Sequence, residues 1–290
     1  MASNRMFLRP LGYGEILDEA FQLYKTNIGL MAGICATVYV PLGIIQLIVL
    51  MGTAGMRNEA GAAAAAGAMG LVALLAIPFS ILMTGALTKA VADRYLQRSS
   101  SIGEAWQYVL QQAGPYIGTS LLAGALVILG LIFCVIPGIY VAFLVAFITE
   151  VMVVEGMYGM AAINRSKDLI AGQIGRVFVF GLILWLVSMV VGWVTAGVTA
   201  VLAGPLGATG SQMVNAVLST GLNLFIVPFP TTAMILLYFD IRVRKEAFDL
   251  QLLQQSIGGG PMPPTQPPTG FPPEPPQSPG DGGGYTPPGY

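Results

Sequence analysis

Long stretches without any charged residue dominate this chain, and they alternate with short segments that hold nearly all of its charges. Residues 26–56, 60–88, 105–149 and 177–239 are four such stretches, with 31, 29, 45 and 63 uncharged residues respectively. Crossing a bilayer takes roughly 20 mostly apolar residues in a helix. The first two stretches therefore each predict one membrane span, and the other two are each long enough for two spans.

Turn signals divide the two longest stretches. Pro137-Gly138 lies shortly after Cys134 in the third, and Gly204-Pro205 begins a glycine-rich segment that ends at Ser211 in the fourth. Such pairs mark turns, so each stretch is interpreted as a hairpin of two spans. Because the runs are apolar on all sides, helices are favoured over barrel strands. The pattern predicts an all-α integral membrane protein with six transmembrane helices, at residues 27–51, 69–92, 114–134, 138–155, 176–203 and 213–239.

The basic residues predict the orientation of these spans. Twelve of the 13 Lys and Arg residues fall in segments that lie on one side of a six-span chain, and only Arg57 falls on the other. Basic segments are retained on the cytoplasmic side of a membrane. We therefore expect a multi-pass protein of the plasma membrane with both termini in the cytoplasm.

Three polar segments have the pattern of one amphipathic helix. Gly14-Glu15 and Gly103-Glu104 are each followed by twelve residues and then by Ile-Gly, and Gly159-Met160 begins a looser third copy. Apolar residues share one face in each segment, with Trp106 on that face in the second. Ser101 and Glu104 have the spacing of a capping box. Because each segment precedes two spans, the sequence predicts three repeats of an amphipathic surface helix plus two spans.

The composition changes abruptly near the C-terminus. Residues 256–290 contain 12 prolines and 9 glycines, and such a segment cannot bury enough apolar surface to offset its ordering entropy. We expect a disordered cytoplasmic tail there, and a single membrane domain over residues 1–255. A passive tail is favoured over a ligand for a proline-binding partner, because PxxP spacings are nearly automatic in so proline-rich a segment.

Composition excludes several kinds of chemistry. Only 9% of the residues are charged, against about 25% in soluble domains, and the net charge of −1 gives no reason to expect nucleic acid. Histidine is absent, which removes imidazole bases and imidazole metal ligands. Cys35 and Cys134 have no disulfide or metal spacing. The sequence predicts no catalytic, cofactor or metal site, and we expect that the protein is not an enzyme.

Four residues are weak functional candidates: Glu150, Asn223, Pro228 and Trp106. Glu150 is an ionisable residue inside a predicted span, but it lies only five residues from Glu155, about 7.5 Å of helix rise. An interfacial role with the carboxylate reaching water is therefore favoured over a proton or ion site. An amide in a span, such as that of Asn223, more often links helices than binds substrate. Pro228 frees a carbonyl and kinks its helix.

Three stretches carry a resemblance to a known family: Leu11–Phe21, Glu155–Ser166 and Tyr238–Asp249. Together they resemble the bacterial six-helix family called the glycerophosphoryl diester phosphodiesterase membrane domain, from which Gly12, Asn164 and Ala247 depart. The resemblance implies a six-helix membrane fold. The catalytic domain that gives this family its name is not present in the chain, so the resemblance implies no activity.

Two functions remain open at this stage. The lack of catalytic residues and the three surface helices favour a non-catalytic scaffold or accessory subunit that contacts lipids, or a membrane or cytoplasmic protein partner. The alternative is a small-molecule or lipid transporter, because internal repeats and proline-broken helices mark transporter sites. The scarcity of charge in the spans is an argument against that alternative.

Overall fold

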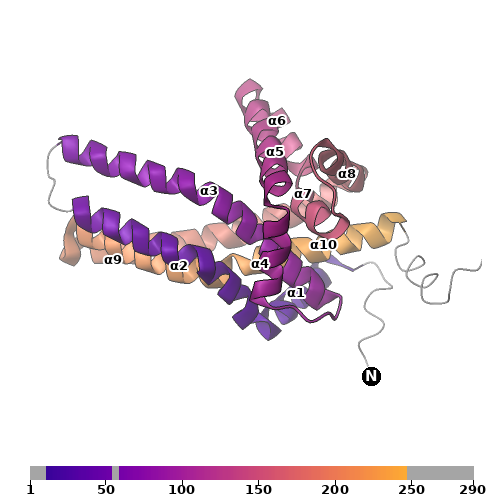
Figure 1. Ribbon diagram of the computed structural model, residues 1–290, viewed down its shortest axis with the longest axis horizontal. Coiled ribbons are helices and arrows are strands. Elements are labelled where there is room, and N and C mark those ends of the chain that lie inside the picture. The colour runs from indigo at the N-terminus through magenta and orange to yellow at the C-terminus, as the bar shows by residue number, and fades with distance from the viewer. Residues whose placement is uncertain (1–10, 54–58, 247–290) are drawn as a thin grey trace, which may run out of the picture. The chain divides into compact units, whose positions relative to one another are not determined.

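The computed structural model describes residues 11–53 and 59–246, and all regular structure in these two ranges is helical (Figure 1). The elements are α1 (Tyr13–Thr26), α2 (Ile28–Thr53), α3 (Glu59–Tyr95), α4 (Ile102–Gln111), α5 (Ala113–Phe133), α6 (Val135–Leu144), α7 (Ile148–Glu150), the π-helix η2 (Val151–Glu155), α8 (Met160–Ile170), α9 (Ile174–Ile226) and α10 (Pro228–Glu246). Arg57 and the predicted tail at 256–290 lie outside the described residues.

Six stretches of these helices are long and apolar enough to cross a membrane. They are Ile28–Thr53, Ala63–Tyr95, Ala113–Phe133, Val135–Glu155, Ile174–Leu202 and Gly210–Lys245, and they are called spans 1 to 6 below. Their ends differ from the predicted ends by at most six residues. The prediction of an all-α protein with six spans is therefore confirmed, and the chain is a multi-pass membrane protein.

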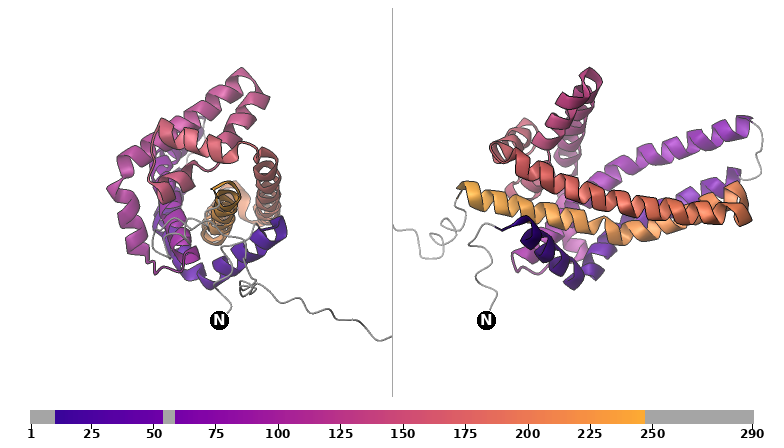
Figure 2. Two further views of the ribbon diagram at one scale, coloured as in Figure 1. Left: turned by 90° about the vertical axis from the view of Figure 1, so that its right-hand side faces the viewer. Right: turned by 180° about the vertical axis from the view of Figure 1, so that it is seen from behind.

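Helix α9 contains both arms of a hairpin, although its helical hydrogen-bond pattern is continuous from Ile174 to Ile226. The hydroxyl of Thr199 lies 3.2 Å from the amide oxygen of Asn215. A straight helix would separate two residues sixteen positions apart by about 24 Å. The chain therefore reverses between these residues, as the right-hand view of Figure 2 shows. The predicted turn near Gly204-Pro205 falls within this interval.

Short helices form at all three places where amphipathic patterns predict them. In α4, Ser101 Oγ accepts from Glu104 N and Ser101 N donates to Glu104 Oε2, which confirms the capping box. Helix α1 packs on α10, α4 on α3, and α8 on α6 and η2. Each short helix thus covers a last span: α4 and α8 cover that of the preceding unit, and α1 that of the third. That the three units are copies of one another stays a prediction.

The centre of the bundle is α10, which the other helices surround in the left-hand view of Figure 2. Residues 235–241 of α10 are all buried, and Tyr238 packs edge-to-face against Phe147 at 5.8 Å. The α5–α6 hairpin instead points away from α2, α3 and α9 in Figure 1. Its tip exposes Ile132, Phe133 and Ile136. An apolar surface of this kind is stable in lipid, which is as apolar as these side chains.

Candidate functional site

Span 4 is interrupted near its middle. Helix α6 ends at Leu144, three turn residues follow, and α7 begins at Ile148. The hydroxyl of the fully buried Ser166, on α8, donates to Leu144 O at 2.8 Å and accepts from Phe147 N at 3.2 Å. Backbone groups at membrane depth need such partners, because no water is present to satisfy them. A side chain of α8, a short helix outside the spans, thus replaces helical hydrogen bonds that the interruption removes.

The C-terminal part of span 4 is a π-helix, which is rare and often occurs at functional sites. Here the hydroxyl of Tyr108, on α4, donates to Val153 O at 2.9 Å. Burial raises the pKa of Tyr108, and the nearby Asp93 carboxylate raises it further, so this hydroxyl keeps its proton and remains a donor.

Span 6 has a one-residue irregularity at Val227, between α9 and α10, where Val227 keeps helical dihedral angles and its N–H still donates to Asn223 O. This point is called the interruption of span 6 below. Pro228 has no N–H, so the helical hydrogen bond that a residue at this position would donate is lost. The hydroxyl of Tyr24, on α1, donates to Phe225 O at 2.8 Å. Burial raises the pKa of Tyr24, and the electrostatic effect of Cys35 adds to the rise, so the hydroxyl is protonated. Each of the short helices α1, α4 and α8 therefore donates one side-chain hydroxyl to a main-chain carbonyl at an irregular point of a span.

A buried ion cluster fixes the N-terminal segment to the last span. The side chain of Asp240 is fully buried, and its Oδ2 lies 2.9 Å from both Arg176 Nη2 and Arg244 Nε. Its Oδ1 accepts from Leu11 N at 2.7 Å, and both arginines donate to Leu11 O. The guanidinium of Arg176 also stacks on the ring of Tyr13. The cluster joins residues that are up to 233 positions apart.

A second cluster centres on Glu155, at the end of span 4. Arg165 Nε lies 2.7 Å from its Oε2, and the hydroxyl of Tyr238 donates to its Oε1 at 2.7 Å. Arg242 lies 3.8 Å from the same carboxylate and 3.2 Å from the Tyr238 hydroxyl. The two clusters therefore bring together residues from all three stretches that carry the family resemblance.

A crevice with polar side chains lies between the two arms of α9 and the start of α10, next to the interruption in span 6. It has a volume of about 590 Å³, and Ser188, Thr195, Asn215, Ser219, Asn223 and Thr231 contribute its polar side chains. The hydroxyls of Ser188 and Thr195 bond to carbonyls of their own helix. Within the part of the chain that the structure describes, the Asn223 amide has no hydrogen-bond partner. An amide can donate twice, so this group is available to a ligand.

Glu150 is placed differently from the sequence expectation. Only 4% of the residue is exposed, so the carboxylate does not reach water along the helix as its distance from Glu155 suggested. Helices α3, α5 and α8 pack around α7 and cover it. The physical reason is that the position of a residue along its own helix does not determine which neighbouring helices cover its side chain.

The other candidates are divided between two places. Asn223 and Pro228 lie at the interruption of span 6, where Asn223 O accepts from Val227 N at 3.3 Å. Trp106 packs on the core from α4, well away from that crevice, and its buried indole N–H has no partner among the described residues. The roles of Ser166, Tyr24 and Tyr108 were not predicted from the sequence, although a hydroxyl on an amphipathic helix near a span is the signal that points to them.

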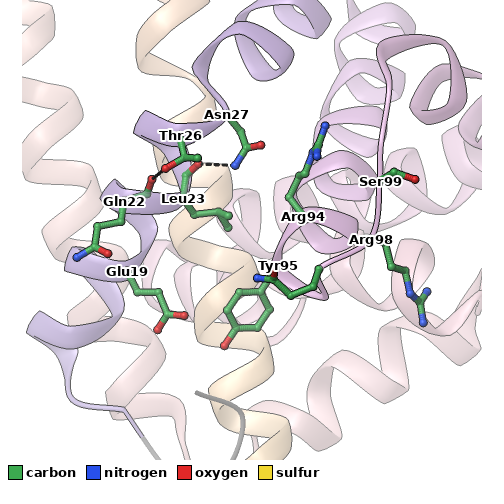
Figure 3. Close-up of a pocket in the computed structure, with 10 residues that line it drawn as sticks. Glu19, Gln22, Leu23, Thr26, Asn27, Arg94, Tyr95, Arg98 and Ser99 are labelled. Atoms are coloured by element: carbon green, nitrogen blue, oxygen red, sulfur yellow. Dashed lines mark hydrogen bonds between the residues drawn. The ribbon is translucent and has the colours of Figure 1, made fainter. Parts of the chain in front are cut away.

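A second pocket of about 530 Å³ lies between α1 and the end of α3 (Figure 3). Arg94 and Arg98 line it opposite Glu19. The guanidinium groups of the two arginines point in different directions in Figure 3, and Arg94 Nη2 already donates to Ser100 O at 2.8 Å. The two arginines therefore do not form a clamp for a phosphate or carboxylate group.

No protein-family model, curated protein or solved structure matches this chain. Its functional interpretation therefore depends on the interrupted spans, the crevice beside Asn223, the enclosed Glu150 and the two ion clusters. In both clusters the described carboxylates and guanidinium groups pair with one another, so they stabilise the fold. Two of the polar groups without a partner among the described residues, the Asn223 side-chain amide and the Glu150 carboxyl, lie beside the two interruptions.

Proposed function

We propose that this protein transports a small uncharged polar molecule or a lipid across the membrane. The observation that carries the proposal is the crevice beside the interruption of span 6, with the unpartnered amide of Asn223 on its wall. Interrupted helices near the middle of the bilayer form the substrate sites of many transporters. An unpartnered polar group inside a membrane is costly, and a substrate would remove that cost by hydrogen bonding.

The crevice chemistry sets the substrate class. Its polar groups are amides and hydroxyls, and none of the residues around it is charged. A charged substrate would lack a counter-charge there, whereas a polyol, an amide or an uncharged lipid headgroup would find donors and acceptors. The scarcity of charge in the spans therefore argues against the transport of ions, but not against the transport of uncharged molecules.

We also propose that the protein is non-catalytic, belongs to the six-helix family that it resembles, and lies in the plasma membrane with both termini in the cytoplasm. Histidine is absent from the sequence, and the described residues contain no group of three or more metal-ligating side chains. The segments that carry Arg94, Arg165, Arg176 and Arg242 lie at one end of the spans, which agrees with the charge rule for cytoplasmic loops.

Proteoliposomes test the transport proposal. Vesicles that contain the purified protein should swell faster than protein-free vesicles in a panel of uncharged solutes such as glycerol, xylitol and urea. Asn223→Leu should slow the protein-dependent rate roughly tenfold, because the solute loses a hydrogen bond of about 1–1.5 kcal/mol. The matched control is Asn164→Leu, at an exposed position on α8 outside the spans, which should leave the rate unchanged.

A second arm of the experiment distinguishes lipid from solute. Protein-dependent movement of a fluorescent lipid between leaflets, without solute-driven swelling, would identify a lipid as the substrate. If folded protein moves neither solutes nor lipid, the transport proposal is wrong.

A scaffold or accessory subunit is the second candidate. The short helices α1, α4 and α8 favour it, because we infer that they form a collar around one end of the spans. The two ion clusters fix the α1 and α8 parts of this collar to the spans. This collar exposes Phe21, Leu110 and Met160, one from each helix. Absence of flux in a folded protein would leave this candidate in place of transport.

Cysteine labelling tests the proposed orientation. Cys134 is exposed at the tip of the α5–α6 hairpin, whereas Cys35 is buried. A membrane-impermeant maleimide should label Cys134 from the outside of intact cells. In a Cys134→Ala background, Ser99→Cys should label only after the membrane is permeabilised, because exposed Ser99 lies at the charged end of the spans. Labelling of Ser99→Cys in intact cells would reverse the proposed topology.

A further inference from the structure

Glu150 lies where span 4 is least regular. It is the last residue of α7, between the three-residue turn that follows Leu144 and the π-helix η2. Its Oε2 atom is fully buried and has no hydrogen-bond partner in the part of the chain that the structure describes. An ionised carboxylate in such a setting carries a desolvation cost of about several kcal/mol, unless a counter-charge or hydrogen bonds offset it.

The surroundings of Glu150 are polar but uncharged. Tyr116 of α5 lies near it and is almost fully buried, and the Tyr116 ring packs against Gly85 of α3. Thr88, one turn further along α3, is fully buried, and its hydroxyl oxygen also has no partner among the described residues. Helices α3 and α7 are in contact, so two oxygens with unmet hydrogen-bonding capacity lie on contacting elements.

The charged groups on the elements packed against α7 have partners elsewhere. Lys89 pairs with Asp93 on α3, and Glu155 of η2 pairs with Arg165 of α8, at 2.8 and 2.7 Å. Arg94 of α3 donates to Ser100 O. The remaining described charges of these elements, Lys167 and Asp168 of α8, are exposed, and α5 carries no charge. Of the tyrosines on these elements, Tyr116 interacts electrostatically with Glu150, whereas Tyr95 of α3 stacks on Phe239 of α10.

We propose that Glu150 is a proton-binding site: its carboxyl group holds a proton while span 4 is closed and exchanges it when the interrupted segment opens to water. One part of this proposal rests on the proposed transport function, namely that the bound proton is coupled to the movement of substrate. Proton binding itself requires only the geometry around α7. Intramembrane carboxylates that form proton relays in transporters occupy similar settings.

The interruption supplies a way for the proton to exchange. Because helix α6 stops at Leu144, the segment from Ile148 to Glu155 can shift without unwinding α6. The Ser166 hydroxyl bridges the two sides of the interruption with one bond to each. Breaking these two hydrogen bonds frees the start of the segment, while the hydrogen bond from Tyr108 to Val153 O and the ion pair of Glu155 with Arg165 still hold its end. The π-helix offers a second arrangement of the residues between.

Carbodiimide labelling of the intact protein in liposomes tests the proposal. N,N′-dicyclohexylcarbodiimide enters the bilayer and reacts with a protonated carboxyl group. The acid proton moves to a carbodiimide nitrogen, and the carboxyl oxygen bonds to the central carbon. Peptide mass spectrometry should find the label on Glu150 and not on Glu155 or Asp240, whose carboxylates are ion-paired. Above the pH at which the acid titrates, labelling should fall about tenfold per pH unit.

Each labelling result supports or overturns the proton site at Glu150, whether or not the protein transports solutes. Labelling of Glu150 that falls with rising pH, disappears in Glu150→Gln and is unchanged when sodium and potassium are replaced by choline supports a proton site. Protection by sodium or potassium overturns it in favour of a metal-cation site. Absence of label on Glu150 in folded protein, or label spread equally over Glu155, also overturns it. Flux without labelling would retain transport and reject proton coupling.

Discussion

Replacing Asp240 with asparagine is expected to lower the free energy of unfolding by about 3–5 kcal/mol, because the change removes one partner of a buried ion cluster. Arg176 and Arg244 would lose their carboxylate, and Leu11 N would lose a charged acceptor. Thermal unfolding of the purified variant in detergent, followed by circular dichroism, measures this loss.

Asp93→Asn is the matched control. Asp93 pairs with Lys89 at 2.8 Å through side chains that are partly exposed, so the loss should stay below about 1 kcal/mol. If Asp240→Asn costs no more than Asp93→Asn, the buried cluster does not fix the N-terminal segment to α10. Helix α1 would then be held on α10 mainly by packing, whereas the ion pair of Glu155 with Arg165 would still link α8 to span 4.

Replacing Trp106 with glutamate should destabilise the protein by about 2–4 kcal/mol, somewhat less than the cost of removing a fully buried aromatic side chain, because Trp106 is partly buried. Trp106 packs on the core from α4, and its indole N–H is buried. The introduced carboxylate would add a desolvation cost at the same place. Unfolding in detergent and in vesicles with and without anionic lipid measures the effect, which should not depend on the lipid.

In the comparison variant, both Arg94 and Arg98 are replaced by glutamine, which removes their charges. It removes the hydrogen bond from Arg94 to Ser100 O and one exposed charge, so about 1–2 kcal/mol should be lost. A larger loss than for Trp106→Glu, or a loss that depends on anionic lipid, would mean that the collar senses lipid charge. The pocket in Figure 3 would then be its binding site.

Local sequence was a good guide to helix ends and a poor guide to interruptions. Pro78 and Pro228 follow similar residues, yet α3 continues through Pro78 while the chain breaks before Pro228. Only at the second does a hydroxyl from another helix, that of Tyr24, bond a carbonyl beside the break. Span 4 breaks at Val145–Phe147, where no Pro or Gly occurs, because Ser166 of α8 satisfies the exposed backbone.

The candidate site was predicted only in part. Asn223 and Pro228 were identified from their positions inside an apolar run, and the structure places both beside the crevice. The burial of Glu150 could not be predicted, because it results from α3, α5 and α8 closing around α7. Ser166 and Tyr108 were missed for the same reason, since their partners lie 22 and 45 positions away in the chain.

The sequence by itself determined the solvent of this protein, the number of its spans and the three short helices between them. These properties follow from the summed transfer free energies of neighbouring residues and from local helix periodicity, which need no knowledge of distant segments. Only the tertiary structure decided that the Asp240 carboxylate is ion-paired and that the Glu150 carboxyl is buried without a counter-charge. The free energy of a buried charge depends on the groups that surround it in space, and those come from helices far apart in the chain.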